Sequence, residues 1–94
     1  MKVTSPSRIG DIAEFYAVTW LWDHGYEVFN NCGSTGLIDL IALSPDGEVV
    51  MIDVKSRKTI NHQTSRTVAQ KKLGVQQLSF NPNTRKMRFV EHKE

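Results

Sequence analysis

Several features that would assign a chain to a particular class are scarce or missing in this sequence. Its 94 residues include one cysteine, Cys32, which excludes an internal disulfide and suits a reducing compartment. No apolar run approaches the roughly 18–20 residues that cross a bilayer, and the first residues lack the apolar segment of a secretory signal. We therefore expect a cytoplasmic protein without a membrane partner.

Histidine is also scarce, because His24, His62 and His92 are scattered and give no zinc-binding spacing. No repeat, linker or low-complexity segment divides the chain. The sequence therefore predicts a single domain over residues 1–94, which would bury about 60–70% of the surface of the unfolded chain.

The net charge of +2 conceals a strong asymmetry. Before Lys55 the chain has two basic and eight acidic residues, whereas from Lys55 onward it has ten basic residues and two acidic ones. One alternative is that the basic residues only solvate a surface. An acidic half joined to a basic half is better explained by cations held on one side and phosphates on the other, which favours nucleic acid as the partner.

The stretch from residue 36 to residue 55 organises the rest of the chain. It reads Gly-Leu-Ile-Asp-Leu-Ile-Ala-Leu, then Ser-Pro-Asp-Gly, then Glu-Val-Val-Met-Ile-Asp-Val-Lys. This pattern predicts two apolar strands joined by a bulged three-residue turn, with Gly47 in the left-handed conformation. In that register Ser44 faces Glu48, and a turn one residue shorter would reverse the face of every side chain on the second strand.

The same register places Asp39 opposite Asp53, and Lys55 follows on the same face. Like charges directly opposite each other destabilise a sheet, so the pair needs compensation. A divalent cation with hard oxygen ligands would provide it, and Lys55 would lie beside that metal and a bound phosphate. The alternative is that Lys55 simply forms salt bridges with both aspartates.

The motif Gly36-Leu-Ile-Asp39 followed by Ile52-Asp53-Val54-Lys55 resembles the signature of the PD-(D/E)XK nuclease superfamily. Its closest likeness is to small Holliday-junction resolvases, resolvase-like bacterial proteins, and intron- or phage-borne nucleases. The resemblance extends over roughly residues 8–58, and Ile38 stands where the superfamily has proline. It implies an α/β (α+β) fold with a restriction-endonuclease-like αβββαβ core, a mixed central sheet flanked by helices. It also implies DNA cleavage with Mg²⁺ or Mn²⁺, in a bacterial, archaeal or phage-infected cell.

The resemblance also implies roles for individual residues. Asp39 and Asp53 would ligate the metal, joined by the Val54 carbonyl and, directly or through water, by Glu14 from the first helix. Lys55 would orient or help deprotonate the attacking water. The alternative for Glu14 is an ordinary solvated helix glutamate.

DNA would approach over the basic half of the chain and over polar residues near the metal. The cations would mostly contact phosphates, with little reading of base sequence. The expected DNA-binding residues are Arg8, Ser34, Arg57, Lys58, Gln63, Arg66, Gln70, Lys71 and Lys72.

Helical and strand signals predict the remaining elements. A first helix should present one stripe to the sheet, formed by Ile9, Ala13, Tyr16, Ala17 and Trp20. The outer face of the central hairpin is apolar as well, so later elements should cover it. The expected elements are a helix over 7–24 capped by Ser5 or Ser7, a strand over 26–30, a helix over 67–73 closed by Gly74, and a C-terminal hairpin of strands over 75–80 and 86–90.

Phe15, Val18 and Trp22 form a further apolar stripe on the far side of the first helix. Either the C-terminal segment covers it or two copies associate there. A homodimer or higher homo-oligomer would suit two symmetric strand cuts. Three functions remain open: a structure-selective nuclease, a sequence-selective homing-, restriction- or phage-type nuclease, and a non-catalytic DNA-binding module.

Overall fold

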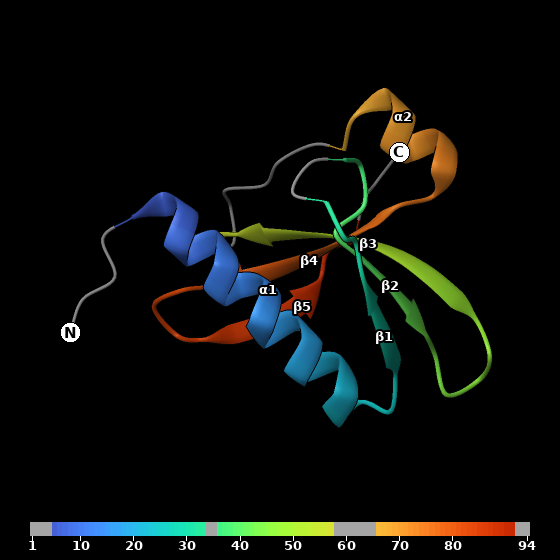
Figure 1. Ribbon diagram of the computed structural model, residues 1–94, viewed down its shortest axis with the longest axis horizontal. Coiled ribbons are helices and arrows are strands. Elements are labelled where there is room, and N and C mark those ends of the chain that lie inside the picture. Colours follow the sequence, from blue (N-terminus) through green and yellow to red (C-terminus); the bar gives the residue numbers. More distant parts are fainter. Residues whose placement is uncertain (1–4, 34–35, 58–65, 92–94) are drawn as a thin grey trace.

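The computed structural model describes residues 5–33, 36–57 and 66–91. Helix α1 lies diagonally across one face of a sheet, and the short helix α2 lies at one end of the molecule (Figure 1). The elements in chain order are α1 (Pro6–Asp23), β1 (Glu27–Asn30), β2 (Leu40–Leu43), β3 (Val49–Ser56), α2 (Val68–Leu73), β4 (Gln76–Asn81) and β5 (Lys86–Phe89).

The sheet is mixed, and its strands follow the chain order β1-β2-β3-β4-β5. All neighbouring pairs are antiparallel except β3 and β4, which run parallel. A parallel pair requires a crossover, and α2 lies in it. The predicted αβββαβ order and the additional C-terminal hairpin are therefore confirmed.

The central hairpin has the predicted turn. The Gly47 N–H donates to the Ser44 carbonyl at 2.9 Å, and Gly47 has a φ of 89°, in the left-handed region that favours glycine. The Ser44 N–H then donates to the Glu48 carbonyl at 2.7 Å, and Leu43 pairs with Val49. The bulged turn and its register are confirmed.

The ladder between β2 and β3 ends at the pair Leu40–Ile52, one residue short of Asp39. The Asp39 N–H donates to the carbonyl of Ile52 at 2.8 Å, whereas a regular ladder would turn this N–H away from β3. Asp39 and Asp53 are therefore not a regular cross-strand pair, which corrects the predicted geometry of this position. Asp39 lies where β2 begins to separate from β3.

The core lies between α1 and the sheet. The buried residues of α1 are Ala13, Ala17 and Leu21, which lie on one stripe, and Ala17 and Leu21 pack against apolar residues of β2, β3 and β4. Tyr16 and Trp20 flank this stripe, with ring centroids 4.9 Å from Phe80 and 5.7 Å from Phe89. The predicted stripe thus faces the sheet, and the structure adds Leu21, a buried residue that the prediction had left out of it. Small alanines let the helix approach closely, and the two rings extend the contact toward β4 and β5.

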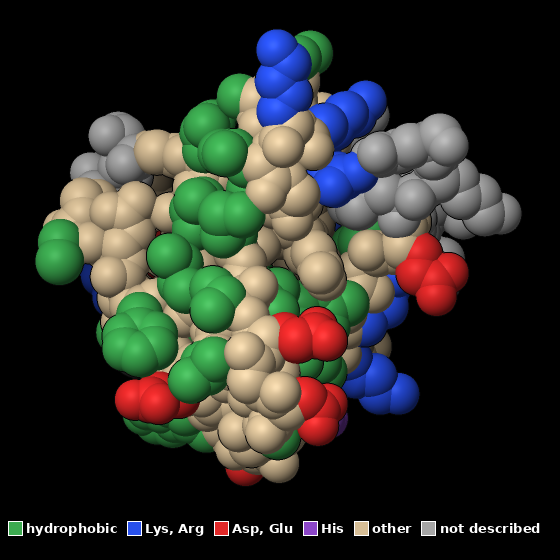
Figure 2. All heavy atoms as spheres, turned by 90° about the vertical axis from the view of Figure 1, so that its right-hand side faces the viewer, with side chains coloured by type: hydrophobic (Ala, Val, Ile, Leu, Met, Phe, Trp, Pro, Cys, Tyr) green, Lys and Arg blue, Asp and Glu red, His purple; other side chains and the backbone are tan. Residues whose placement is uncertain are grey.

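The outer apolar surfaces differ from the sequence prediction. Val18 packs against the core, whereas Phe15 and Trp22 are 76% and 61% exposed. On the outer face of the central hairpin, Ile41 and Val49 are also exposed, so later elements do not cover that face within the described residues. Figure 2 shows hydrophobic side chains gathered on the surface at this end of the molecule.

In the described part of the chain, no helix is long and apolar enough to cross a membrane.

Candidate active site

The carboxylate of Asp39 occupies the gap at which the β2–β3 ladder ends. Its Oδ2 accepts a hydrogen bond of 2.7 Å from the Val54 N–H, which an intact antiparallel ladder would have given to a β2 carbonyl. In a strand the N–H and C=O of one residue point toward the same neighbour, so the Val54 carbonyl points into this gap as well. Local separation of two strands therefore brings a carboxylate and a backbone carbonyl together.

Asp53 comes from the middle of β3 and is only 6% exposed. Ile52 and Val54 pack toward the α1 core, so alternation along the strand turns Asp53 to the other face of the sheet. Its Oδ2 accepts a hydrogen bond from the Gln77 Nε2 at 3.4 Å and lies 3.4 Å from the Lys55 Nζ. A buried carboxylate is thus held by one amide and one ammonium group.

The two aspartates interact directly. Removal from water raises the pKa of Asp39, the Val54 N–H lowers it, and both a hydrogen bond with Asp53 and the Asp53 charge raise it again. The net pKa lies above the ordinary aspartate value, although the charge of Lys55 also acts to lower it. Such a site disfavours two bare negative charges, which a bound cation would offset.

Glu14 on α1 lies close enough to both aspartates for their charges to act on it. Burial raises its pKa, and the charges of Asp39, Asp11 and Asp53 raise it further, in that order. Glu14 is nevertheless exposed, and no three Asp, Glu, His or Cys side chains in residues 5–33, 36–57 and 66–91 form a group able to hold one metal ion. The carboxylates that meet directly are therefore those of Asp39 and Asp53, and Glu14 acts on them electrostatically.

The donor set suits a hard divalent cation. Asp39 and Asp53 supply two carboxylates and Val54 a carbonyl, all oxygen ligands of the kind that Mg²⁺ and Mn²⁺ prefer. Lys55 places its ammonium beside Asp53, and its side chain is 37% exposed, so it can also reach a bound anion. Glu14 remains available through an intervening water.

Arg57 continues the site beyond the end of β3. Its backbone N–H donates to the Phe80 carbonyl at 2.7 Å, which fixes the residue beside β4. Burial lowers the pKa of its guanidinium, and the charge of Asp53 partly offsets that effect. Arg57 is therefore an expected DNA-binding residue on which the charge of Asp53 acts.

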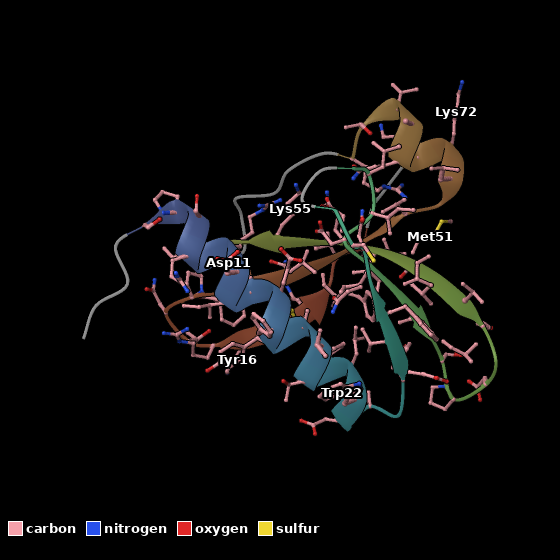
Figure 3. All side chains as sticks on the ribbon, viewed as in Figure 1. Asp11, Tyr16, Trp22, Met51, Lys55 and Lys72 are labelled. Carbon is pink, nitrogen blue, oxygen red and sulfur yellow. The ribbon has the colours of Figure 1, made fainter. Side chains whose placement is uncertain are left out.

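Other expected DNA-binding residues lie elsewhere. The Arg8 backbone N–H donates to the Ser5 side chain and closes the cap of α1, and its side chain is exposed. Lys71 and Lys72 are exposed in the last turn of α2, where Lys72 extends outward from the molecule, away from Lys55 (Figure 3). The remaining expected contacts, Ser34, Lys58 and Gln63, lie outside the described residues.

Gln70 and Arg66 bond to the protein backbone. The buried Gln70 amide accepts from the Thr67 N–H and donates to the Leu37 carbonyl, each at 3.0 Å. The Arg66 guanidinium donates to the Val75 carbonyl at 3.0 Å. The structure therefore gives both side chains an anchoring role, and Gln70 ties α2 to the segment that carries Asp39.

Gln77 was not identified from the sequence. It is 1% exposed and lies beside Asp53 in the parallel register between β3 and β4. Nothing in the sequence of β4, Gln-Gln-Leu-Ser-Phe-Asn, distinguishes Gln77 from its polar neighbours, and its partner could be found only after that register was known. Arg88 of β5 was missed for the same reason, because its neighbour Ser79 is known only from the strand pairing.

The architecture defines the class first. The chain shares its fold with a bacterial homing endonuclease, I-Ssp6803I, with a TM-score of 0.69 over 94% of this chain and 66% of that one. The two sequences are 20% identical, so this likeness establishes the fold alone. The described protein is thus an α/β domain of the homing-endonuclease fold, with a carboxylate pair where its central strands separate.

The chain belongs to the family described as "Uncharacterised protein family UPF0102", whose model matches residues 13–79. UPF0102 proteins from Bifidobacterium longum subsp. infantis and from Bifidobacterium longum strain NCC 2705 are each 33% identical over 60 residues, or 62% of this chain. The matched segment is 48% of each relative, so it spans about half the length of these curated relatives.

Proposed function

We propose that this protein is an endonuclease that hydrolyses DNA phosphodiester bonds with Mg²⁺ or Mn²⁺. The observation that carries the proposal is the meeting of the Asp39 and Asp53 carboxylates beside the Lys55 ammonium. The fold shared with a homing endonuclease is consistent with nuclease activity. The basic half of the chain supplies the charge that a polyanionic substrate needs.

The residues divide the chemistry between them. A metal ion bound by Asp39, Asp53 and the Val54 carbonyl would polarise the phosphate and lower the pKa of a bound water. Lys55 would orient the attacking water, or help to deprotonate it when its amine is neutral, and its ammonium form would offset negative charge that develops on the phosphate. Gln77 holds Asp53 in place, and Glu14 would act on the metal through a bound water.

Cleavage assays on purified variants test the site. Asp53→Asn, Asp39→Asn and Lys55→Ala should each lower the cleavage rate by at least about 10²-fold, the lower end of what a positioned catalytic group contributes. Glu48→Gln is the matched control, because Glu48 is an exposed carboxylate in the hairpin turn. Undiminished cutting by folded Lys55→Ala protein refutes the assigned role of Lys55.

Within this class we favour a structure-selective, Holliday-junction-resolvase-like activity. Reading bases requires side chains that enter a groove, whereas the expected DNA-binding residues are mostly cations, which contact phosphates with little reading of base sequence. A homing- or restriction-like specificity is the second candidate, because the structural neighbour is a homing endonuclease. Four-way, flapped, single-stranded and linear duplex DNA of random sequence separate the two. Preference for branched DNA supports the first candidate, and cutting at one duplex sequence supports the second.

A non-catalytic DNA-binding module is the remaining candidate. A pure binder gains nothing from carboxylates that repel phosphate, and Asp39 and Asp53 meet at a site where burial and their mutual repulsion raise the pKa of Asp39. Addition of Mg²⁺ to a preformed DNA complex distinguishes the two classes. Cleavage supports an enzyme, and persistent intact complex supports the binding module.

We further propose that two copies associate through the outer face of α1. Phe15 and Trp22 are seven residues apart, so they lie on one side of the helix, and both are largely exposed. Phe15 lies beside Asn30 at the end of β1, which is an open edge of the sheet. A second copy would cover both the apolar helix face and that edge, and it would supply the second active site for two strand cuts.

A further inference from the structure

A cavity of about 400 Å³ lies over the C-terminal hairpin and is not part of the carboxylate site. Its cationic lining residues are Arg57, Lys86 and Arg88, and its neutral polar lining residues are Ser79, Asn81 and Thr84. None of the described residues that line it is acidic. Two cations from β5 and one that directly follows β3 therefore face one hollow, with no carboxylate among its described lining residues.

The register of the sheet connects this cavity to the candidate active site. Lys55 on β3 pairs with Ser79 on β4, and Ser79 pairs with Arg88 on β5. Paired residues of neighbouring strands point to the same face, so these three side chains form a row on the face that also carries Asp53. Two strand spacings of about 4.8 Å place Arg88 on the order of 10 Å from Lys55. The cavity is thus a lateral continuation of the site.

The hairpin holds the cavity in a defined shape. The Asn81 Oδ1 accepts hydrogen bonds from the Asn83 and Thr84 N–H groups, at 2.9 and 3.2 Å, which closes the loop between β4 and β5. Arg57 is fixed from the other side by its backbone bond to the Phe80 carbonyl. Its half-buried guanidinium is a planar donor suited to two oxygens of one phosphate.

We propose that this cavity binds a backbone phosphate of the DNA strand adjacent to the phosphate being cleaved, with Arg57, Lys86 and Arg88 as its cations. The proposal rests on the proposed function, because it identifies where the substrate strand leaves the active site. Contacts of this kind fix the position and direction of the strand without reading its sequence. Lys86 and Arg88 are thereby assigned a role that their place in the sequence alone does not indicate.

Equilibrium DNA binding in EDTA tests the cavity without requiring cleavage. Arg88→Gln and Lys86→Gln should each weaken binding several-fold on every DNA sequence. Each should also reduce the slope of log K against log salt by about one unit, the effect of losing one phosphate contact. The double variant should reduce the slope by about two units. Thermal melts confirm that each variant is folded.

Arg85→Gln is the matched control, because it removes the same charge from the same hairpin on the opposite face. The Arg85 guanidinium lies 5.6 Å from the centroid of the Tyr16 ring, on the α1 side. Its salt slope should stay at the wild-type value. If the Arg88 and Lys86 variants also keep the wild-type slope, the proposal is overturned, whether or not the protein cuts DNA. If they lose slope in a protein that never cuts, the cavity binds a backbone phosphate of DNA and the proposed nuclease function fails.

A free phosphate ion offers the same oxygens as a backbone phosphate of DNA, so the two ligands are tested in separate experiments. Titration with inorganic phosphate, followed by amide NMR shifts of Ser79 and Arg88, reports on binding of the free ion. Binding of duplex DNA that protects these amides and is lost in the double variant supports the DNA subsite. Shifts with inorganic phosphate at low millimolar concentration, together with an unchanged DNA salt slope, overturn it in favour of a free anion site.

Discussion

At the scale of single residues, the surroundings of Asp39 disfavour the ionised form of its carboxylate. Burial and the neighbouring Asp53 raise its pKa, while the Val54 N–H acts in the other direction. A group whose pKa is raised on folding adds stability below its ordinary pKa, and that stability is lost as the pH rises through the pKa of the folded state. The metal-free protein therefore carries a penalty at neutral pH that a neutral side chain would remove.

We expect Asp39→Asn to raise the melting temperature of the metal-free protein, because the amide oxygen can still accept from Val54 while the charge is gone. The gain over wild type should be small near pH 4 and larger near pH 8, on either side of the ordinary carboxylate range. Thermal melts in EDTA across this range measure it. A gain that is equal at both ends would mean that the charge of Asp39 is not its source.

A bound metal ion should stabilise the wild-type protein but not the Asp39→Asn variant, which lacks one carboxylate ligand. A ligand present at about one hundred times its Kd stabilises a fold by about 2.7 kcal/mol, and 1 kcal/mol corresponds to about 4–8 °C for a domain of this size. Mg²⁺ should therefore raise the melting temperature of wild-type protein and leave that of Asp39→Asn nearly unchanged. An equal rise in both proteins would place the metal elsewhere.

Gln77 is a positioning residue, and its effect should appear in metal affinity. Gln77→Leu removes the Nε2 donor to the buried Asp53 carboxylate. Loss of such a supporting bond typically weakens metal binding by about 10–100-fold. The Mg²⁺ concentration for half-maximal cleavage should rise by that factor, with the rate at saturating Mg²⁺ largely retained. A lower rate with unchanged metal dependence would instead indicate a purely structural role.

At the scale of the elements, we expect substitution by alanine to have opposite effects on the free energy of unfolding at two glycines. Gly74 ends α2 with a φ of 76°, where a side chain costs about 1–2 kcal/mol, so Gly74→Ala should destabilise the fold by that amount. Gly10 lies within α1 with nothing within 4 Å of an added Cβ, so Gly10→Ala should stabilise it by about 0.5–1 kcal/mol. Urea unfolding curves compare the two variants. Equal shifts would contradict the backbone argument.

Helix α2 also matters for the site, although it carries none of its carboxylates. Thr67 caps the helix, and its neighbour in the capping box, Gln70, bonds to the Leu37 carbonyl two residues before Asp39. A six-residue helix has little stability of its own, so its cap and this long-range bond fix the segment that positions Asp39. The geometry of one metal ligand is thus supported by a sequence-distant element.

At the scale of the whole molecule, self-association through α1 is the testable property. Phe15→Lys or Trp22→Lys should convert a dimer into monomers in sedimentation experiments, because a charge cannot be buried cheaply at an apolar contact. Val68→Lys is the control, since Val68 is 71% exposed on α2. Monomers should still nick one strand but lose paired cuts. A dimer that survives both changes excludes this face as the interface.

The sequence by itself determined the elements and the central register. Local signals were sufficient there, because Gly47 and Gly74 adopt left-handed conformations and the apolar runs have strand or helix periods. These features also predicted that Asp39, Asp53 and Lys55 would gather near one point. They could not give the end of the β2–β3 ladder, which places Asp39 in a gap and bonds it to the Val54 N–H.

Only the tertiary structure decided which distant residues support the site. Gln77, Ser79 and Arg88 reach the row beside Lys55 through the parallel pairing of β3 with β4, a contact that no local pattern encodes. The same applies to Gln70, which the sequence suggested for DNA and which the fold buries against the backbone. Periodicity and turn chemistry act over a few neighbours, whereas strand order and burial depend on how the whole chain packs.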